Sequence, residues 1–317
     1  MGLRLADRWV WDFWHVLVGV EHHLFYLQAP RSLGDPEQRH WHANIGHAVS
    51  HDLRNWTVLA DVLAPAAPGA WDDYTTWTGC VQRHDGRWWM FYTGTNRREG
   101  GLVQRVGLAT SEDLLTWDRH GDEPLIELDP RWYEELDLSI WHDQAWRDPW
   151  IYRDEAGTFH ALVTARVNPG PTEARGVIGH AVSEDLLRWE VQPPLTSPGP
   201  FGHLEIPQTV EVGGCWWLLF STPAAAPHVR ASYPDSEVTG THVLRANGPL
   251  GPYDWSTHRL LDGDAAETRY GGRVVPDGSG GHMLLTWLLG DGAGGFVGEI
   301  ADPLPVAVEG DRLVVRR

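Results

Sequence analysis

The sequence has only two cysteines, Cys80 and Cys215, among 317 residues. Two thiols are too few for a disulfide framework or for a zinc site built on cysteine. Long apolar runs are missing too, because none approaches the roughly 20 residues that a membrane-spanning helix needs. The opening residues, MGLRLADRWVWDF, contain neither an apolar signal core nor a cleavage site. We therefore expect a cytoplasmic protein.

Positive charge is scarce. Lys and Arg together number 25 against 43 Asp and Glu, which gives a formal net charge of −18. A field of this sign repels phosphate backbones and anionic lipid surfaces. We therefore expect no nucleic-acid partner and no membrane partner, and we interpret the charge mainly as a source of solubility.

Tryptophan, glycine and proline are abundant, with 19, 35 and 22 residues respectively. Glycine and proline mark frequent turns, and aromatic runs between turns are typical of short strands. The hydrophobic content of 42% is enough for a large core. This composition predicts an all-β protein.

Three segments nearly copy one another: IGHAVSHDLRNW (45–56), VGLATSEDLLTW (106–117) and IGHAVSEDLLRW (178–189), with a weaker fourth copy that ends at Trp255. Strand-like runs with Gly-rich hairpin turns recur in the same order, and they make five units. The units average about 63 residues, longer than WD40 or kelch blades at about 40–50. The repeats predict one five-bladed β-propeller domain over residues 1–317, with four-stranded antiparallel blades.

The first strand of a propeller blade is innermost, and all blades converge at the channel. Counting back from the second strand of each unit identifies the residue at the start of the first strand: Asp12, Thr78, Asp148, Glu205 and the region around Tyr270. Three carboxylates therefore converge on one funnel, where like charges destabilise the fold unless they are offset. Glycosidases use such carboxylates as an acid and as a nucleophile or base. We predict a catalytic site at this position.

Four motifs resemble those of the fructan-active five-bladed propellers, glycoside hydrolase families 32 and 68. They are WVWDFW (9–14), TWTGC (76–80), WRDP (146–149) and HLEIPQ (203–208). The first blade is similar to that of family 32, whereas VWDFW looks more like the family 68 motif than the Asn-Asp-Pro of family 32. From the length of the sequence, we expect no C-terminal β-sandwich of the kind typical of family 32. Family 43 shares the propeller and a three-carboxylate site but inverts configuration, and it stays the main competitor.

The resemblance implies a role for each carboxylate. Asp12 would be the nucleophile, Asp148 would stabilise the transition state, and Glu205 would be the acid/base. We expect like charges and a tryptophan-lined pocket to raise the pKa of Glu205, and Arg147 to bind sugar hydroxyls or Asp148. The candidate substrate-binding residues are Trp11, Trp14, Trp41, Trp77, Thr78, Arg147 and His203.

No cofactor or metal is predicted. His15, His142 and His203 flank the motif strands without a spacing typical of metal ligands. Asp72, Asp73 and Asp143 could offer oxygen ligands to calcium, but we assign no site to them. The tryptophans that end the three repeats, Trp56, Trp117 and Trp189, are expected to be structural.

The most favoured function is a retaining hydrolase of non-reducing β-fructofuranosides, such as sucrose or short fructo-oligosaccharides, with fructosyl transfer as a variant. The alternatives are an inverting arabinofuranosidase or xylosidase of the family 43 type, and a non-catalytic propeller that binds sugar or protein. The three carboxylates argue against the last, because a lectin needs no convergent acids.

Overall fold

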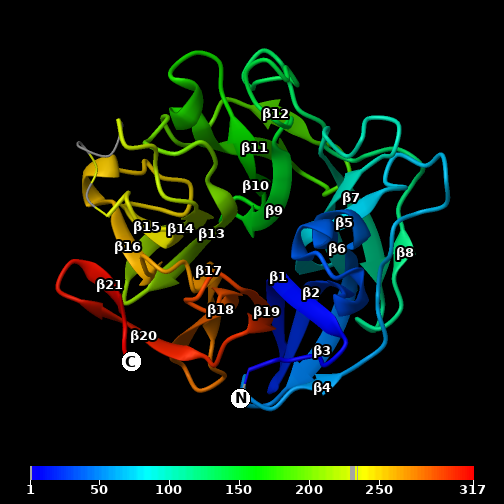
Figure 1. Cartoon of the computed structure of the whole chain (residues 1–317), viewed down its shortest axis with the longest axis horizontal. Coiled ribbons are helices and arrows are strands. Elements are labelled where there is room, and N and C mark those ends of the chain that lie inside the picture. The colour runs from blue at the N-terminus through cyan, green and yellow to red at the C-terminus, as the bar shows by residue number, and fades with distance from the viewer. Residues whose placement is uncertain (1, 229–232, 234) are drawn as a thin grey trace.

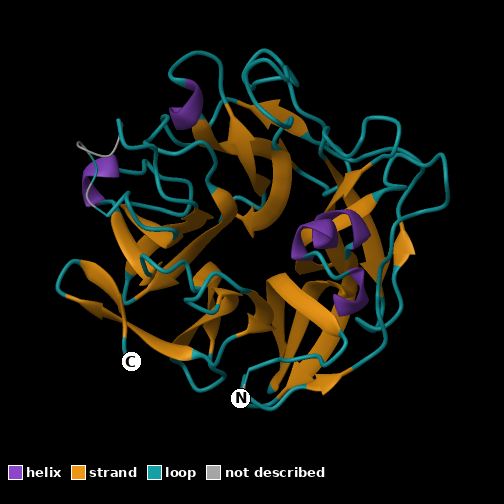
Figure 2. Cartoon of the chain, in the orientation of Figure 1, coloured by secondary structure: helices purple, strands orange, loops and turns teal. Residues whose placement is uncertain are grey.

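The computed structural model describes residues 2–228, 233 and 235–317, which form five antiparallel sheets around a central axis (Figure 1). Strands make up most of the regular structure (Figure 2). The short 3-10 helices are η1 (Arg31–Leu33), η2 (Pro36–His42), η3 (Thr172–Ala174) and η5 (Trp255–Thr257). The prediction of an all-β, five-bladed propeller is confirmed.

Four of the sheets are built from four consecutive strands each. The strands of the first two blades are β1 (Arg8–Val18), β2 (Glu21–Pro30), β3 (Asn44–Ser50), β4 (Thr57–Val58), β5 (Thr75–His84), β6 (Arg87–Thr95), β7 (Arg105–Ser111) and β8 (Asp118–Arg119). Those of the third and fourth blades are β9 (Trp146–Arg153), β10 (Phe159–Arg166), β11 (Gly176–Ser183), β12 (Glu190–Gln192), β13 (Glu205–Val212), β14 (Cys215–Thr222), β15 (Gly240–Ala246) and β16 (Arg259–Gly263).

The fifth blade differs from the expected four strands. Its main path is β17 (Arg269–Pro276), β18 (His282–Gly290), β20 (Leu304–Glu309) and β21 (Arg312–Val315), and β19 (Phe296–Ile300) also pairs with β18. Strand β19 lies beside β1 of the first blade. The N–H of Ile300 donates a hydrogen bond of 3.0 Å to the carbonyl of Leu3, so the N-terminal segment helps to join the first and fifth blades.

The repeated sequence motif joins neighbouring blades. Asp113 accepts hydrogen bonds from two backbone N–H groups of the turn that follows it, at 2.8 and 2.9 Å. This turn places Trp117 of the second blade edge-on against Phe25 of the first, with ring centroids 5.7 Å apart. Trp189 of the third blade packs in the same way against Phe91 of the second, at 5.8 Å. These two tryptophans are therefore structural, as expected.

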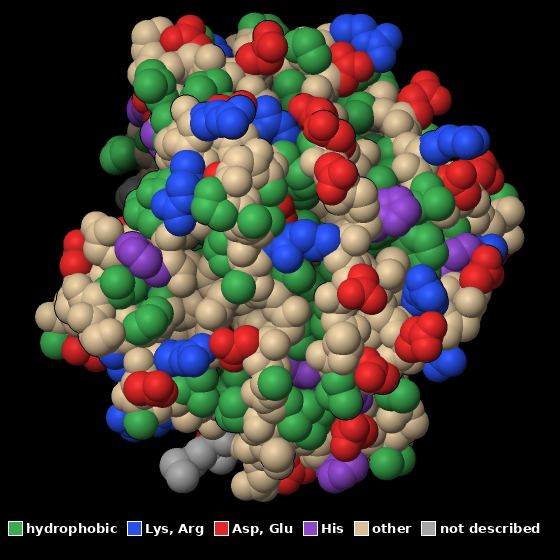
Figure 3. All heavy atoms as spheres, turned by 90° about the vertical axis from the view of Figure 1, so that its right-hand side faces the viewer, with side chains coloured by type: hydrophobic (Ala, Val, Ile, Leu, Met, Phe, Trp, Pro, Cys, Tyr) green, Lys and Arg blue, Asp and Glu red, His purple; other side chains and the backbone are tan. Residues whose placement is uncertain are grey.

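The outer surface carries both signs of charge. On the face shown in Figure 3, acidic and basic side chains are interspersed. Within the described ranges, no helix is long and apolar enough to span a bilayer.

Candidate active site

The innermost strand of every blade carries a β-bulge. In each case one extra residue interrupts the register between the first and second strands of the blade. A bulge bends its strand and re-aims the side chains beside it. The residues in the five bulges include Asp12, Thr78, Asp148, Ile206 and Gly271. The φ angles of Asp148 and Ile206 are 58° and 54°, a region in which residues other than glycine are strained.

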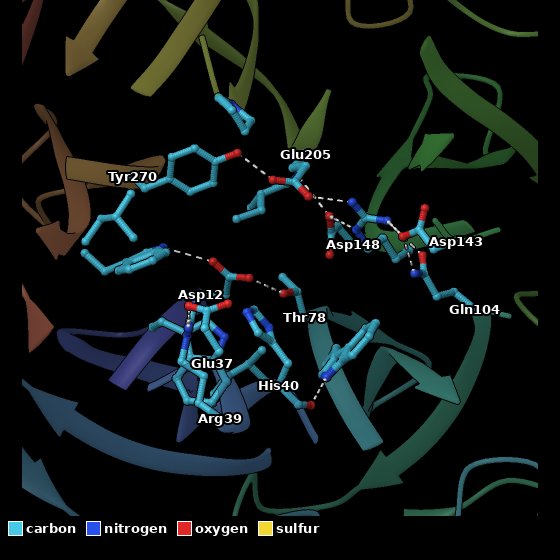
Figure 4. A pocket seen from close by; sticks show the side chains of 18 of the residues that line it. Asp12, Glu37, Arg39, His40, Thr78, Gln104, Asp143, Asp148, Glu205 and Tyr270 are labelled. Carbon is cyan, nitrogen blue, oxygen red and sulfur yellow. Dashed lines mark hydrogen bonds and ion pairs between the residues drawn. The ribbon is translucent and has the colours of Figure 1, made fainter. Parts of the chain in front are cut away.

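A pocket of about 640 Å³ lies where these bulges meet. Asp12 from the first blade, Asp148 from the third and Glu205 from the fourth all line it (Figure 4). Thr78 from the second blade and Tyr270 from the fifth complete the ring. Each blade thus contributes a side chain from the position that the sequence identified.

Asp12 is held by two hydrogen bonds from other blades. Its Oδ1 accepts from the indole Nε1 of Trp287 at 2.9 Å, and its Oδ2 accepts from the hydroxyl of Thr78 at 3.0 Å. Burial, with the nearby charges of Asp148 and Glu205, raises the pKa of Asp12 to about 7. The carboxyl therefore exchanges a proton near neutral pH.

Asp148 also accepts two hydrogen bonds. Its Oδ2 accepts hydrogen bonds from the hydroxyl of Thr164 at 2.8 Å and from the backbone N–H of Ile206 at 3.1 Å. Burial raises the pKa of Asp148; the positive charge of Arg147 opposes this effect and the negative charge of Glu205 adds to it. The contact with Ile206 joins the third and fourth blades directly beside Glu205.

Glu205 has a donor on each oxygen. Arg147 Nη2 lies 2.5 Å from its Oε1, and the hydroxyl of Tyr270 lies 2.5 Å from its Oε2 (Figure 4). Burial favours the protonated form, but Arg147, His203 and Tyr270 together outweigh it and lower the pKa of Glu205. The sequence-based expectation of a raised pKa is therefore wrong, because it did not place Arg147 directly on this carboxylate.

A buried arginine interacts electrostatically with Asp12 and Asp148. Arg273 on β17 is 1% exposed, and it donates hydrogen bonds to the carbonyls of Phe13 and Pro207 at 3.2 and 3.0 Å. Burial lowers its pKa to about 10, and the charges of Asp148 and Asp12 counteract this effect. The guanidinium therefore stays charged and offsets part of the repulsion within the pocket.

Aromatic side chains form one wall. Trp11, Trp41 and Trp77, three of the predicted substrate-binding residues, line the pocket. Trp41 stacks on Tyr74 with ring centroids 5.4 Å apart and an angle of 10° between the planes. A Cβ atom at Gly101 would lie 2.4 Å from the ring of Trp41, so only glycine allows this close approach. Planar apolar faces of this kind suit the apolar face of a sugar ring.

Two predicted substrate-binding residues do not line the pocket. Trp14 is 1% exposed and stacks on Phe25 inside the first blade. The bulge at Asp12 inserts one residue, so Trp14 no longer shares the face of Asp12 as simple alternation would require. His203 is also buried, and its Nδ1 lies 3.1 Å from Nη2 of Arg147, behind the pocket surface.

Several lining residues were not predicted. Helix η2, between β2 and β3, brings Glu37, Arg39 and His40 to the rim. Gln104 and Asp143 come from segments that precede β7 and β9. None of them lies in a repeat or a recognised motif, so the sequence offered only their residue types as a signal.

No calcium site emerges from the acidic residues considered above. Asp72 accepts hydrogen bonds from Tyr92 and Arg119, and Asp73 accepts from the backbone N–H groups of Gly69 and Arg97. Across residues 2–228, 233 and 235–317, no group of three or more His, Cys, Asp or Glu side chains is arranged to hold a metal ion.

Two known proteins are similar in sequence to most of this chain. Sucrose-6-phosphate hydrolase of Bacillus subtilis is 24% identical over 282 residues, which cover 84% of this chain and 52% of the relative. The extracellular sucrase of Zymomonas mobilis is 24% identical over 295 residues, which cover 78% of this chain and 69% of the relative. The chain thus spans about half the length of the first relative and somewhat more than two thirds of the second.

Solved structures show the same fold. The structure of sucrose-6-phosphate hydrolase from Lactobacillus gasseri superimposes with a TM-score of 0.76 at 18% identity, covering 99% of this chain and 62% of that one. The family model of the glycosyl hydrolases family 32 N-terminal domain matches residues 15–271. This range includes Asp148 and Glu205 and amounts to most of the chain. The chain therefore belongs to glycosyl hydrolase family 32.

Proposed function

We propose that this propeller is a retaining glycoside hydrolase that acts on non-reducing β-fructofuranosides. The observation that carries the proposal is the meeting of Asp12, Asp148 and Glu205 from three blades in one pocket. Membership of family 32 supports it, as do the printed names of the relatives, a sucrose-6-phosphate hydrolase and a sucrase. A single catalytic domain over residues 1–317 is part of the same proposal.

Each carboxylate has a distinct role in this mechanism. The ionised Asp12 attacks the anomeric carbon and forms a covalent fructosyl intermediate. Glu205 protonates the leaving oxygen and then, as a carboxylate, removes a proton from the attacking water. Asp148 stays ionised and accepts hydrogen bonds from sugar hydroxyls, which stabilises the positive charge that develops on the ring.

The surroundings of Asp12 and Glu205 favour the opposite protonation from the one that this reaction needs. The pKa of Asp12 is raised to about 7, whereas that of Glu205 is lowered. Free enzyme near neutral pH thus carries the reactive combination, ionised Asp12 with protonated Glu205, only as a minor form. Because the two groups interact, the pH dependence of kcat/KM reports the pair and not either residue alone.

The substrate is a small, soluble fructoside such as sucrose or a short fructo-oligosaccharide. A pocket of about 640 Å³ with Trp11, Trp41 and Trp77 on its wall accommodates one or a few sugar units. The same covalent intermediate gives hydrolysis with water and transfer with an acceptor sugar. A cytoplasmic location is also proposed, although one relative is named an extracellular sucrase.

Product analysis tests the function. Sucrose, inulin-type and levan-type oligosaccharides and aryl arabinofuranosides are incubated with the protein, and with Asp12→Asn as the control. Release of fructose from sucrose that Asp12→Asn lacks supports the proposal. Activity on arabinofuranosides with none on fructosides would favour the family 43-like alternative, and no turnover of any sugar would favour a binding propeller.

The stereochemistry is measured separately. With methanol as a competing acceptor, a retaining enzyme converts sucrose to methyl β-fructofuranoside, because two displacements restore the configuration. The α-anomer as the enzymatic product would instead mean a single displacement by an activated acceptor, and it would remove the nucleophile role of Asp12.

A further inference from the structure

The guanidinium of Arg147 is shared among three carboxylates. Its Nη2 donates to Oε1 of Glu205 at 2.5 Å, and its Nη1 donates to Oδ2 of Asp143 at 3.0 Å (Figure 4). Its Nε lies 3.6 Å from Oδ2 of Asp148. Arg147 is only 8% exposed, so these charges interact with little screening by water. The more strongly Asp143 neutralises this cation, the less of its charge acts on Glu205.

Gln104 completes a clamp around Arg147. Its Nε2 donates to Oδ2 of Asp143 at 2.8 Å, and its Oε1 accepts from Nη1 of Arg147 at 2.9 Å. Gln104 precedes β7 in the second blade, and Asp143 precedes β9 in the third. Gln104 is 1% exposed. The clamp therefore fixes the guanidinium from two blades, on the side away from Glu205.

The other groups around Glu205 do not replace Arg147 as a positive charge in contact with it. Tyr270 on β17 donates a hydrogen bond to it, and His203 just before β13 lies 4.0 Å from its Oε1. Asp148 on β9, Asp12 on β1 and His40 in η2 interact with it electrostatically. Burial lowers the pKa of His40 to about 4, so its ring is neutral near pH 7. Arg147 is thus the permanent cation in contact with Glu205 among the described residues.

We propose that Asp143 and Gln104 are positioning residues that set the proton occupancy of Glu205 through Arg147. This inference rests on the proposed acid/base role of Glu205. Arg147 favours the ionised form of Glu205, and the clamp holds the guanidinium in place while Asp143 limits how much of its charge acts on that carboxyl. A sugar hydroxyl that accepts the Nη2 hydrogen bond withdraws it from Glu205, while Asp143 still holds and neutralises the guanidinium. Glu205 then takes one proton from water and can deliver it to the leaving oxygen.

A charge swap within the clamp tests the proposal. Asp143→Asn removes a negative charge from Arg147 but keeps a side chain of the same size. Glu205 then receives more of the cation, and its titration in the ligand-free protein should move to lower pH by about 1 unit. The maximum of kcat/KM for sucrose should fall about tenfold. Above its pKa, a carboxyl whose pKa is lowered by one unit has a tenfold smaller protonated fraction.

The double variant Asp143→Asn/Gln104→Glu returns the negative charge to Arg147 from the other arm of the clamp. We expect it to recover most of the titration shift and most of the lost kcat/KM. Asp129→Asn, which removes a carboxylate paired with Arg131 outside the pocket, is the matched control and should change neither. In Asp143→Glu, which keeps the negative charge, the titration of Glu205 should match that of the unaltered protein.

The titration of Glu205 is followed by carboxyl ¹³C NMR, with Glu205→Gln to assign the signal, so it does not depend on turnover. An unchanged Glu205 titration in Asp143→Asn, or a double variant that behaves like the single one, overturns the proposal. Absence of fructoside turnover in the unaltered protein would instead refute the proposed function, and the titration would still decide the role of the clamp.

Discussion

The hydroxyl of Tyr270, from the fifth blade, lies 2.5 Å from Oε2 of Glu205, from the fourth. Burial and the negative charge of Glu205 raise the pKa of Tyr270 well above 10, so the phenol keeps its proton and donates it. Tyr270 and Arg147 thus occupy the two oxygens of the same carboxylate. Both contacts favour the ionised form of Glu205.

Tyr270→Phe should raise the pKa of Glu205, because a hydrogen bond to the charged form is lost. We expect the acid limb of the kcat/KM profile for sucrose to move to higher pH by about 1 unit. The ring still packs against Trp287, at 5.8 Å between centroids, so the melting temperature should change little. A shift of the acid limb to lower pH would contradict this account of the contact.

Asp12→Asn should abolish turnover and stabilise the fold at alkaline pH. The pKa of Asp12 is raised from 3.8 to about 7, so the folded protein holds a proton that the unfolded chain releases between these values. The free energy of unfolding therefore falls as pH rises from about 4 to 7. An amide keeps an oxygen for Trp287 and an N–H for Thr78.

The comparison is made by urea unfolding of Asp12→Asn and the unaltered protein at pH 4, 6 and 8. At pH 8 the variant should be more stable by on the order of 2–4 kcal/mol, and at pH 4 the two proteins should be equal. A stability difference that is the same at all three pH values would mean that the Asp12 carboxyl does not titrate as described.

Glu205→Ala should spare substrates with good leaving groups. An aryl fructoside needs little protonation as it departs, so its first step should survive far better than that of sucrose. The second step lacks a base, and azide should partly restore it by attacking the covalent intermediate. Kinetics on both substrates with and without azide measure this, and equal losses without rescue would exclude Glu205 as the acid/base.

Buried histidine pairs should make the propeller sensitive to acid. His23 and His47 lie 3.0 Å apart between ring nitrogens, as do His242 and His258. Burial, with the partner ring, lowers the pKa of His47 and of His242 from 6.5 to about 3. These lowered values mean that the unfolded chain binds protons that the folded protein does not, so stability is lost as pH falls from 6.5 toward 3.

His242→Gln keeps hydrogen-bonding groups but does not titrate. The slope of the free energy of unfolding against pH should become shallower in this window by up to about 1.4 kcal/mol per pH unit, the contribution of one proton. Unfolding by urea at pH 7, 5.5 and 4.5 gives the slope. His51→Gln, at an exposed histidine, is the control that should leave it unchanged, and equal slopes in all three proteins would be incompatible with the argument.

The positions of Asp12, Asp148 and Glu205 could be predicted because the repeats preserve the spacing from the second strand to the start of the first. That spacing can be counted in the amino-acid sequence. The bulges cannot be found in this way, because an extra residue is recognised only from its pairing with the neighbouring strand. The prediction that Trp14 binds substrate took no account of the bulge, and the structure buries this side chain inside the first blade.

The clamp and the proton distribution could not be predicted. Gln104 and Asp143 lie outside the repeats and reach Arg147 through contacts between blades. The pKa of Glu205 depends on which carboxylate Arg147 faces, and the sequence pattern allowed Asp148 as readily. Electrostatic balance within a pocket depends on ångström distances, which residue spacing does not determine.

Each bulge shifts the alternation of side chains between the two faces of its inner strand by one residue. Residues before the interruption follow one alternation and those after it follow the other, so a pocket and a core share a strand without competing for the same side-chain positions. In β1, Trp11 and Phe13 pair with the adjacent residues Leu27 and Tyr26 of β2, and Asp12, the extra residue between them, lines the pocket. A side chain at a bulge can therefore face the pocket while the residues on either side of it keep their pairing with the second strand of the blade.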